Sequence, residues 1–347
     1  MNTVRPKHPS PIPFIFVAFF LWGCNVPRIS ATQPTGTPIP VITPILDETP
    51  LPPTGELGLA ENPLILALPP SADAPEQVNA AREIAAQFME RTGYVVVVIA
   101  PDTYGDLVDA FENGNVHIAL LDPLAYALAY QKDLVRARYA TADEDGKIKY
   151  GAQILAPRKG GYTSYFNAEI GVNTADASVA LTQFADKKPC WSEETSPSGY
   201  VIPLGLLNQA QVQVRPAAFV GGQTTVVRSL YVGGICDFGS TYIDARKFPS
   251  LEDEMPDLIE QVIVVWQIPE IIPYEVLAFS TNMPQPMRNL FFDLIPAIMQ
   301  TDAGNAAFKT GYDIEEIQAV NDGDFNEFHI LIRESRVDLQ LLLSGEQ

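Results

Sequence analysis

The chain has 347 residues, 47% of them hydrophobic, a formal net charge of −20 and a sequence pI near 4.4. This length favours two lobes over a single core. The acidity excludes a nucleic-acid-binding protein, which needs a basic face to displace counterions from phosphates. It does not exclude a small anionic ligand, because salt screens distant charges within ~10 Å.

The first 24 residues have the pattern of a targeting signal. Arg5 and Lys7 precede the apolar segment PIPFIFVAFFLW, which is short for a membrane-spanning helix, and LWGC then ends at Cys24. The segment resembles a bacterial lipoprotein signal with its lipobox, in which Cys24 is the lipidated residue. An ordinary secretory peptide and an uncleaved anchor are the alternatives. In each case we expect the folded part outside the cytoplasm.

Residues 25–62 read as a tether. Eight prolines and six threonines lie in this segment, and each proline fixes φ and removes a backbone donor. Such a composition predicts a semi-extended linker. Together with a lipid on Cys24, it would hold a globular body away from the membrane.

From Pro63 the chain alternates between strand and helix patterns. PLILALPP predicts a buried strand, the following segment has apolar residues at helical spacing up to Gly93, and YVVVVIAP predicts a second buried strand. A helix then ends near Gly114, a strand covers residues 116–121, and a new helix begins at Pro123. This order predicts a parallel sheet with helices on its faces.

Asp122 stands directly before Pro123, at the N-cap position of that helix. One interpretation is a well-formed helix start. The other is that the helix start faces a cleft at the carboxyl end of the sheet. The two are compatible.

The following segment, GGYTSYFNAEIGVNT (residues 160–174), alternates like a strand and is predicted to pass to a second lobe. Further strand and helix patterns follow, and QVIVVWQIPEIIPYEVLAFS reads as a strand, a proline-marked turn and a returning strand. We therefore predict an α/β protein of two lobes with a cleft between them, each lobe a mostly parallel sheet flanked by helices. Residues 63–168 and 274–347 form the first lobe, and residues 169–273 the second.

Once Cys24 is assigned to the anchor, Cys190 and Cys236 remain. Outside the cytoplasm these two can form a disulfide, and both lie in short apolar segments that are candidates for neighbouring strands. Two buried thiols are the alternative.

Residues for catalysis are scarce. His8 lies in the signal, His117 lies in a predicted strand, and His329 precedes a C-terminal helix. No HExxH, P-loop, GxGxxG or CxxC pattern is present, and SPSGY lacks the nucleophile-elbow pattern GxSxG. We expect no enzyme, no metal and no cofactor.

The loop WSEETSPSGYVIP (residues 191–203) places Ser196, Ser198 and Gly199 ahead of a helix predicted to begin near Tyr200. A helix start leaves backbone N–H groups unpaired and carries partial positive charge, so it can seat an oxyanion. Capping of the helix by Ser198 explains the loop equally well.

A resemblance extends from about Pro63 to Val337. The segments SPSGY, GGQTTVVRSLYVGGICDFGSTYIDAR (residues 221–246), DPLAY, GYTS and WQIPEIIP occur in the order of the motifs of PhnD-like proteins. These are the phosphonate, phosphite and phosphate substrate-binding proteins of ABC transporters, in the type II periplasmic-binding-protein superfamily. The resemblance implies a tetrahedral oxyanion held between the lobes. The ligand-binding residues that it implies are Ser196, Ser198, Gly199, Tyr200, Tyr162, Tyr104, Thr224, Asp237 and Asp122.

The chain departs from the family motifs at four places. Pro197 replaces a loop threonine, Thr224 a histidine and Asp122 a glycine, and IPYE, which contains Tyr274 and Glu275, replaces IPND. Each change weakens the site for a doubly charged anion. The added acids suit an ammonium, and therefore a zwitterion such as an aminoalkylphosphonate.

We therefore expect a lipid-anchored, monomeric receptor that closes over a small oxyanion and delivers it to an ABC permease. The alternative is a ligand-sensing or partner-binding lipoprotein on the same fold, with altered or lost oxyanion specificity.

Overall fold

The computed structural model describes residues 56–70 and 72–345. The signal, the tether up to residue 55 and Cys24 lie outside the described residues. Within the described ranges, no helix is both long enough and apolar enough to cross a membrane.

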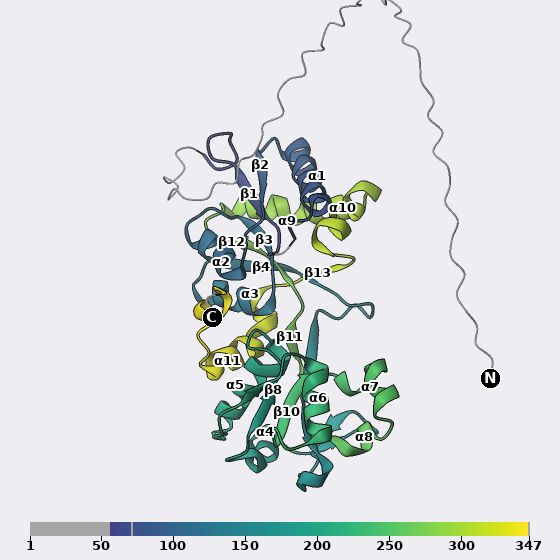
Figure 1. The fold of residues 1–347 in the computed structure, drawn as a ribbon. Helices are drawn as coiled ribbons and strands as arrows, with labels where there is room; N and C mark the ends of the chain where they lie inside the picture. Colours follow the sequence, from purple (N-terminus) through teal and green to yellow (C-terminus); the bar gives the residue numbers. More distant parts are fainter. Residues whose placement is uncertain (1–55, 71, 346–347) are drawn as a thin grey trace, which may run out of the picture. The chain divides into compact units, whose positions relative to one another are not determined.

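The first sheet has six strands in the order β13-β4-β12-β3-β1-β2 (Figure 1). Strand β1 pairs in parallel with β2 and β3, whereas β12 enters between β3 and β4 and is antiparallel to both. The sheet is therefore mixed rather than mostly parallel, because a returning strand fills its centre. The strands are β1 (Leu64–Ala67), β2 (Val96–Ile99), β3 (Ile118–Leu121), β4 (Val135–Thr141), β12 (Val276–Ser280) and β13 (Ile317–Ala319).

The second sheet has the order β11-β5-β10-β8-β9. The long strands β11 and β5 are antiparallel, as are β5 and β10, whereas β10, β8 and β9 are parallel. This sheet is also mixed. The strands are β5 (Lys149–Pro157), β8 (Pro189–Trp191), β9 (Ala218–Phe219), β10 (Phe238–Tyr242) and β11 (Val262–Pro273), and a separate small pair is β6 (Phe166–Asn167) with β7 (Val172–Asn173).

The chain changes sheets between β4 and β5 and returns between β11 and β12. The first change falls between Thr141 and Lys149, before the expected boundary at residue 168. The expected crossing segment, residues 160–174, forms only the short β6–β7 pair. The return falls at Tyr274, where the second boundary was expected.

Helices cover both sheets. The longest, α1, begins at Pro75, whose fixed φ suits a first turn, and ends at Thr92, where Gly93 caps it with a φ of 74°. The helices are α1 (Pro75–Thr92), α2 (Tyr104–Glu112), α3 (Pro123–Gln131), α4 (Ala177–Ala180), α5 (Ile202–Gln209), α6 (Gln223–Val232), α7 (Pro249–Glu254), α8 (Leu258–Gln261), α9 (Gln285–Met299), α10 (Asp302–Tyr312), α11 (Asn326–Ser335) and α12 (Leu339–Leu343).

Three buried apolar clusters hold these layers together. One packs α1, α9 and α10 against the first sheet, around Phe88, Phe291 and Phe308. A second packs α6, α7 and α8 against the second sheet. The largest contains residues of both sheets and of α2, α3, α5 and α11. Since α11 packs on α5, the C-terminal part of the chain also contacts the second sheet's helices.

Candidate ligand-binding site

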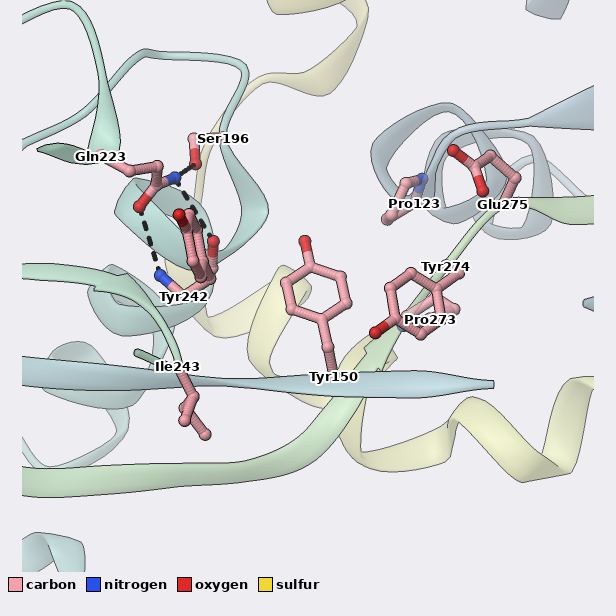
Figure 2. Close-up of a pocket in the computed structure, with 10 residues that line it drawn as sticks. Pro123, Tyr150, Ser196, Gln223, Tyr242, Ile243, Pro273, Tyr274 and Glu275 are labelled. Atoms are coloured by element: carbon pink, nitrogen blue, oxygen red, sulfur yellow. Dashed lines mark hydrogen bonds between the residues drawn. The ribbon is translucent and has the colours of Figure 1, made fainter. Parts of the chain in front are cut away.

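A pocket of about 410 Å³ lies where the two sheet changes and the serine loop meet (Figure 2). Its walls come from the start of β5, the start of α6, the end of β10, the end of β11 and the start of α3. The lining residues are Pro123, Tyr150, Ser196, Ser198, Gln223, Tyr242, Ile243, Pro273, Tyr274 and Glu275.

The serine loop follows β8 and leads into a helical turn, Pro197–Val201, that continues as α5. Ser196 caps this turn, since its hydroxyl oxygen accepts the Gly199 N–H at 3.0 Å. The cap is therefore Ser196 and not Ser198, and Ser198 is left to line the pocket.

Gly199 is required by packing, because a Cβ atom at this position would lie 1.9 Å from the Ser192 hydroxyl oxygen. Tyr200 packs edge-on against Phe219, with ring centroids 4.9 Å apart. Neither of these two predicted ligand residues belongs to the pocket lining.

Gln223 joins the loop to β10. Its Oε1 accepts the Tyr242 N–H at 3.2 Å, and its Nε2 donates to Ser196 Oγ at 3.0 Å (Figure 2). The same Nε2 also donates to Ser192 Oγ at 3.3 Å. The resemblance implies a ligand contact at the next residue, Thr224, which does not line the pocket.

Tyr150 reaches into the centre of the pocket from β5 (Figure 2). Its ring stacks on that of Tyr274, with centroids 5.2 Å apart and planes at 30°. Burial raises the pKa of Tyr150, and a hydrogen bond with the Ser198 hydroxyl opposes this. The sequence analysis missed Tyr150, because residues 149–157, which form β5 of the second sheet, were assigned to the first lobe.

The opposite end of the pocket is acidic. Glu275 lines it and accepts a hydrogen bond from the Thr141 hydroxyl at 2.7 Å. Asp122 caps α3, with Oδ1 2.6 Å from Ala125 N. Burial, joined by the charge of Glu275, raises the pKa of Asp122 to about 6, although the Ala125 N–H lowers it. Asp122 therefore caps α3 as one interpretation predicted, and Pro123 beside it lines the pocket.

Tyr104 lies at the first position of α2, near this acidic end. Burial raises its pKa most, and the charges of Asp122 and Glu275 raise it further, which places all three groups near one another. Tyr104 does not belong to the pocket lining.

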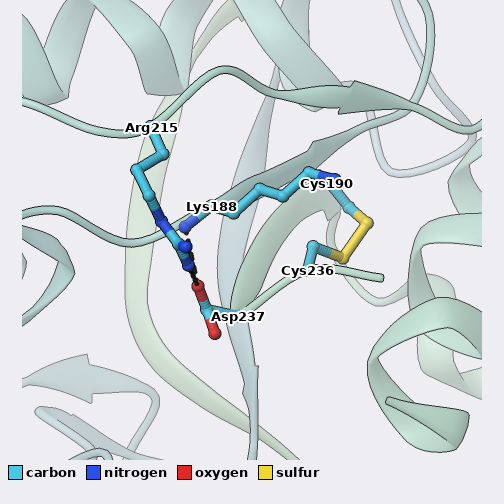
Figure 3. Close-up of a disulfide and its surroundings, with 5 residues drawn as sticks. All are labelled: Lys188, Cys190, Arg215, Cys236 and Asp237. Carbon is cyan, nitrogen blue, oxygen red and sulfur yellow. Dashed lines mark hydrogen bonds and ion pairs between the residues drawn. A yellow bond between two sulfur atoms is a disulfide. The ribbon is translucent and has the colours of Figure 1, made fainter. Parts of the chain in front are cut away.

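Tyr162 and Asp237 lie away from the pocket. Asp237 precedes β10, whereas the pocket contains Tyr242 from the other end of that strand. Its Oδ2 accepts hydrogen bonds from Arg215 Nη2 at 2.6 Å and from Lys188 N at 2.8 Å (Figure 3). Tyr162 packs on Phe184, and its pKa responds to Asp237 and Arg215. The expected position of Asp237 at the far end of the pocket is therefore wrong. Because β5 and β10 run antiparallel, the start of β10, next to Asp237, lies beside the end of β5, at the other end of these strands from the pocket.

Cys190 and Cys236 form a disulfide with Cα atoms 5.5 Å apart (Figure 3). It ties β8 to the segment just before β10, beside the Asp237 ion pair. Both cysteines are buried in the cluster behind the second sheet. The bridge therefore supports the sheet that carries the serine loop.

Two further observations concern catalysis and metals. His117 Nδ1 accepts the Ile65 N–H at 3.1 Å, and His329 stacks on Tyr130 with ring centroids 4.1 Å apart. Burial lowers the pKa of each to about 4, so both histidines are structural. Among the described residues, no three His, Cys, Asp or Glu side chains are grouped to hold a metal ion.

The comparison with protein families identifies the class of protein. A family model described as "ABC transporter, phosphonate, periplasmic substrate-binding protein" matches residues 66–325. The chain belongs to this family. No curated protein matches the chain.

Solved structures give a likeness of fold. XAC2383 from Xanthomonas citri, bound to ATP, has a TM-score of 0.57 at 14% identity, covering 79% of this chain and 96% of that one. A binding protein component of an ABC phosphonate transporter from Pseudomonas aeruginosa has a TM-score of 0.46 at 16% sequence identity, and the match covers 79% of this chain and 87% of that one. PhnD1 from Prochlorococcus marinus in complex with methylphosphonate has a TM-score of 0.47 at 12% sequence identity, and the match covers 78% of this chain and 97% of that one.

Membership of this periplasmic substrate-binding family confirms several expectations. The fold is α/β, with two helix-flanked sheets, in a chain of a periplasmic substrate-binding family. The protein is an extracytoplasmic component of a transporter and not an enzyme. Family membership does not identify the specific ligand, and the residues that line the pocket bear on it.

Proposed function

We propose that this protein is a lipid-anchored receptor that binds a small phosphorus oxyanion and delivers it to an ABC permease. The observation that carries the proposal is the placement of Ser196 and Ser198 in the pocket wall, at the start of a helical turn, in a chain of the phosphonate-binding family. Hydroxyl groups and a helix start are suitable donors for a phosphonate, phosphite or phosphate oxygen.

The two ends of the pocket suggest how the ligand is oriented. The serine end offers donors, whereas Glu275 and the nearby Asp122 offer acceptors. None of the ten lining residues is a lysine, arginine or histidine. A zwitterion such as 2-aminoethylphosphonate fits this arrangement, with its phosphonate at the serines and its ammonium at the acids.

Binding is proposed to act by closure. Tyr150 and Ser198 belong to the second-sheet side, and Pro123 and Glu275 adjoin strands of the first sheet. A ligand that contacts both sides stabilises a closed arrangement by its differential affinity for that state. The chain segments that change sheets, at residues 142–148 and at Tyr274 and Glu275, are the places for a hinge.

A ligand panel tests the proposal directly. We would measure thermal shifts of the purified full chain with phosphate, phosphite, methylphosphonate, 2-aminoethylphosphonate, sulfate and simple amines, followed by calorimetry. A saturable rise in Tm with a phosphorus oxyanion supports the receptor, and a preference for 2-aminoethylphosphonate supports the ammonium end. Absence of any shift with all phosphorus compounds contradicts the proposed ligand class.

The lipid anchor on Cys24 has its own test. Cys24→Ala is expected to release the protein from membranes, because the lipid is the attachment proposed for the mature chain. Unchanged membrane association would show that an apolar anchor is retained instead.

One observation favours a second candidate, a sensor or partner-binding lipoprotein on the same fold. Ser196 and Gln223 already bond to each other, and the nearby acids oppose an anion. If the panel shows no ligand, this candidate replaces the receptor, and retained binding to a membrane protein in its absence would support it.

A further inference from the structure

The hydrogen bonds around Gln223 have a single direction. Tyr242 N–H is a main-chain group that can only donate, so the atom 3.2 Å from it must be the carbonyl oxygen Oε1 of Gln223. This contact fixes the orientation of the amide. The Nε2 group therefore faces the serines, where it can only donate.

Ser196 Oγ is the nearest of the serine oxygens that accept a hydrogen bond from Gln223 Nε2. Its Oγ accepts the Gly199 N–H at 3.0 Å and Gln223 Nε2 at 3.0 Å. A hydroxyl oxygen has two lone pairs, and both are used by these donors. The Ser196 proton is consequently left to donate, and Ser196 lines the pocket although it is only 7% exposed.

Ser198 is placed in the same way. Its Oγ accepts from Gln223 Nε2 at 3.5 Å, and Ser198 lines the pocket. Because the amide can only donate to it, the Ser198 proton is left to donate.

We propose that Gln223 is a positioning residue that sets the serine hydroxyls as donors and so makes this end of the pocket specific for an acceptor oxygen. The inference rests on the proposed function, because the acceptor is the ligand's oxyanion. It adds a device for binding an anion without a cationic side chain. Hydrogen bonds aligned in one direction polarise one another, which strengthens the last donors of the chain.

Two substitutions separate polarity from packing. Gln223→Glu exchanges the donor amide for an acceptor carboxylate of the same shape, so the serine protons turn toward it and away from the ligand. Gln223→Leu removes both polar atoms but adds no acceptor. Affinities for methylphosphonate, phosphite and inorganic phosphate would be measured by calorimetry on the full chain at pH 8 and pH 5.

At pH 8 we expect Gln223→Glu to bind on the order of a hundredfold more weakly than the unchanged chain at the same pH. Gln223→Leu is expected to bind these anions about tenfold more weakly than the unchanged chain at either pH. At pH 5 a carboxyl with the ordinary Glu pKa of about 4.3 is still mostly ionised, so most of the deficit of Gln223→Glu should remain at that pH. Tyr150, Tyr242, Asp122 and Glu275 also surround the site, and comparison at equal pH cancels their titration and that of the ligand.

Gln209→Glu is the matched control, since it makes the same charge change at an exposed position of α5 and should leave affinity within about twofold. Melting temperatures show that each variant is folded. If Gln223→Glu binds as tightly as the unchanged chain, or if both variants lose equally at both pH values, the positioning role is wrong while the receptor stands. If the unchanged chain binds none of the three anions, the proposed function is wrong and this inference falls with it.

Discussion

Two serines of one loop have separable roles. Ser196 caps the helical turn through Gly199 N, whereas Ser198 lines the pocket without capping the turn. Ser198→Ala is therefore expected to weaken ligand binding by ~1–3 kcal/mol, roughly five- to a hundredfold, and to leave Tm nearly unchanged. Calorimetry and thermal melting measure the two quantities.

Ser196→Ala is the matched comparison. Because it removes the cap, it should lower the free energy of unfolding by about 1 kcal/mol in addition to weakening binding. A loss of stability in Ser198→Ala with unchanged affinity would assign Ser198 to the fold instead of the ligand.

The raised pKa of Asp122 predicts that the stability of the fold depends on pH. Its folded-state pKa is raised to about 6, above its ordinary value of about 3.9, mainly by burial. A raised carboxyl pKa means that the ionised form opposes folding, so the stability present below pH 4 is lost as pH rises through about 6. Asp122→Asn keeps an oxygen for Ala125 N but cannot ionise. It should match the unchanged chain at pH 4 and be more stable by about 1–2 kcal/mol at pH 8.

Chemical denaturation of both chains across this pH range measures the difference. A difference in unfolding free energy that stays constant from pH 4 to pH 8 would show that Asp122 does not titrate in this way.

At this scale, local patterns predicted some contacts and missed others. Ser196 and Ser198 were found because a serine-rich loop ahead of a helix is visible in sequence, and Asp122 because it precedes a helical proline. Gln223 and Tyr150 were missed, since each acts through partners far along the chain, Ser196 and Ser198. Asp237 was placed at the wrong end of β10, because strand pairing, and not local sequence, decides which end of this strand lies at the pocket.

Among the elements, the disulfide carries the next prediction. Cys190–Cys236 closes a loop of 46 residues between β8 and β10. A bridge of this span stabilises a fold by about 4 kcal/mol through the unfolded chain. In the denatured, unreduced chain carrying Cys24→Ala, thiol titration should find almost no free sulfhydryl.

Replacing both cysteines by alanine in that background should lower the free energy of unfolding by about 2–4 kcal/mol. Two titratable thiols in the unreduced chain would contradict the bridge.

The elements also show why topology was harder to predict than secondary structure. The strand and helix patterns from Pro63 to Pro123 correspond to β1, α1, β2, α2, β3 and α3. The crossing was placed at residues 160–174, whereas the chain has already reached the second sheet at β5 (Lys149–Pro157). Pairing of β5 with β11 over most of its length makes it part of that sheet, and local sequence does not show such long-range pairing.

At the scale of the whole molecule, the net charge conflicts with the proposed anionic ligand. The chain carries −20 overall, and a second cavity beside the pocket is lined by Asp143, Glu144, Asp313, Glu315 and Glu316 as well as Glu275. A field of this sign repels an approaching anion and lowers its association rate. The neutral donors around Gln223 act only after the ligand has entered the pocket.

Salt should therefore accelerate the association of an anionic ligand. Raising ionic strength from about 0.01 M to 0.15 M shortens the screening length from about 30 Å to about 8 Å and removes much of this repulsion. We expect the association rate of methylphosphonate, followed by stopped-flow tyrosine or tryptophan fluorescence, to rise severalfold over this range. The rate for zwitterionic 2-aminoethylphosphonate should change less, because its charges offset one another. A rate for methylphosphonate that falls with added salt would mean that the ligand meets a positive local field, and that the acids beside the pocket do not govern its entry.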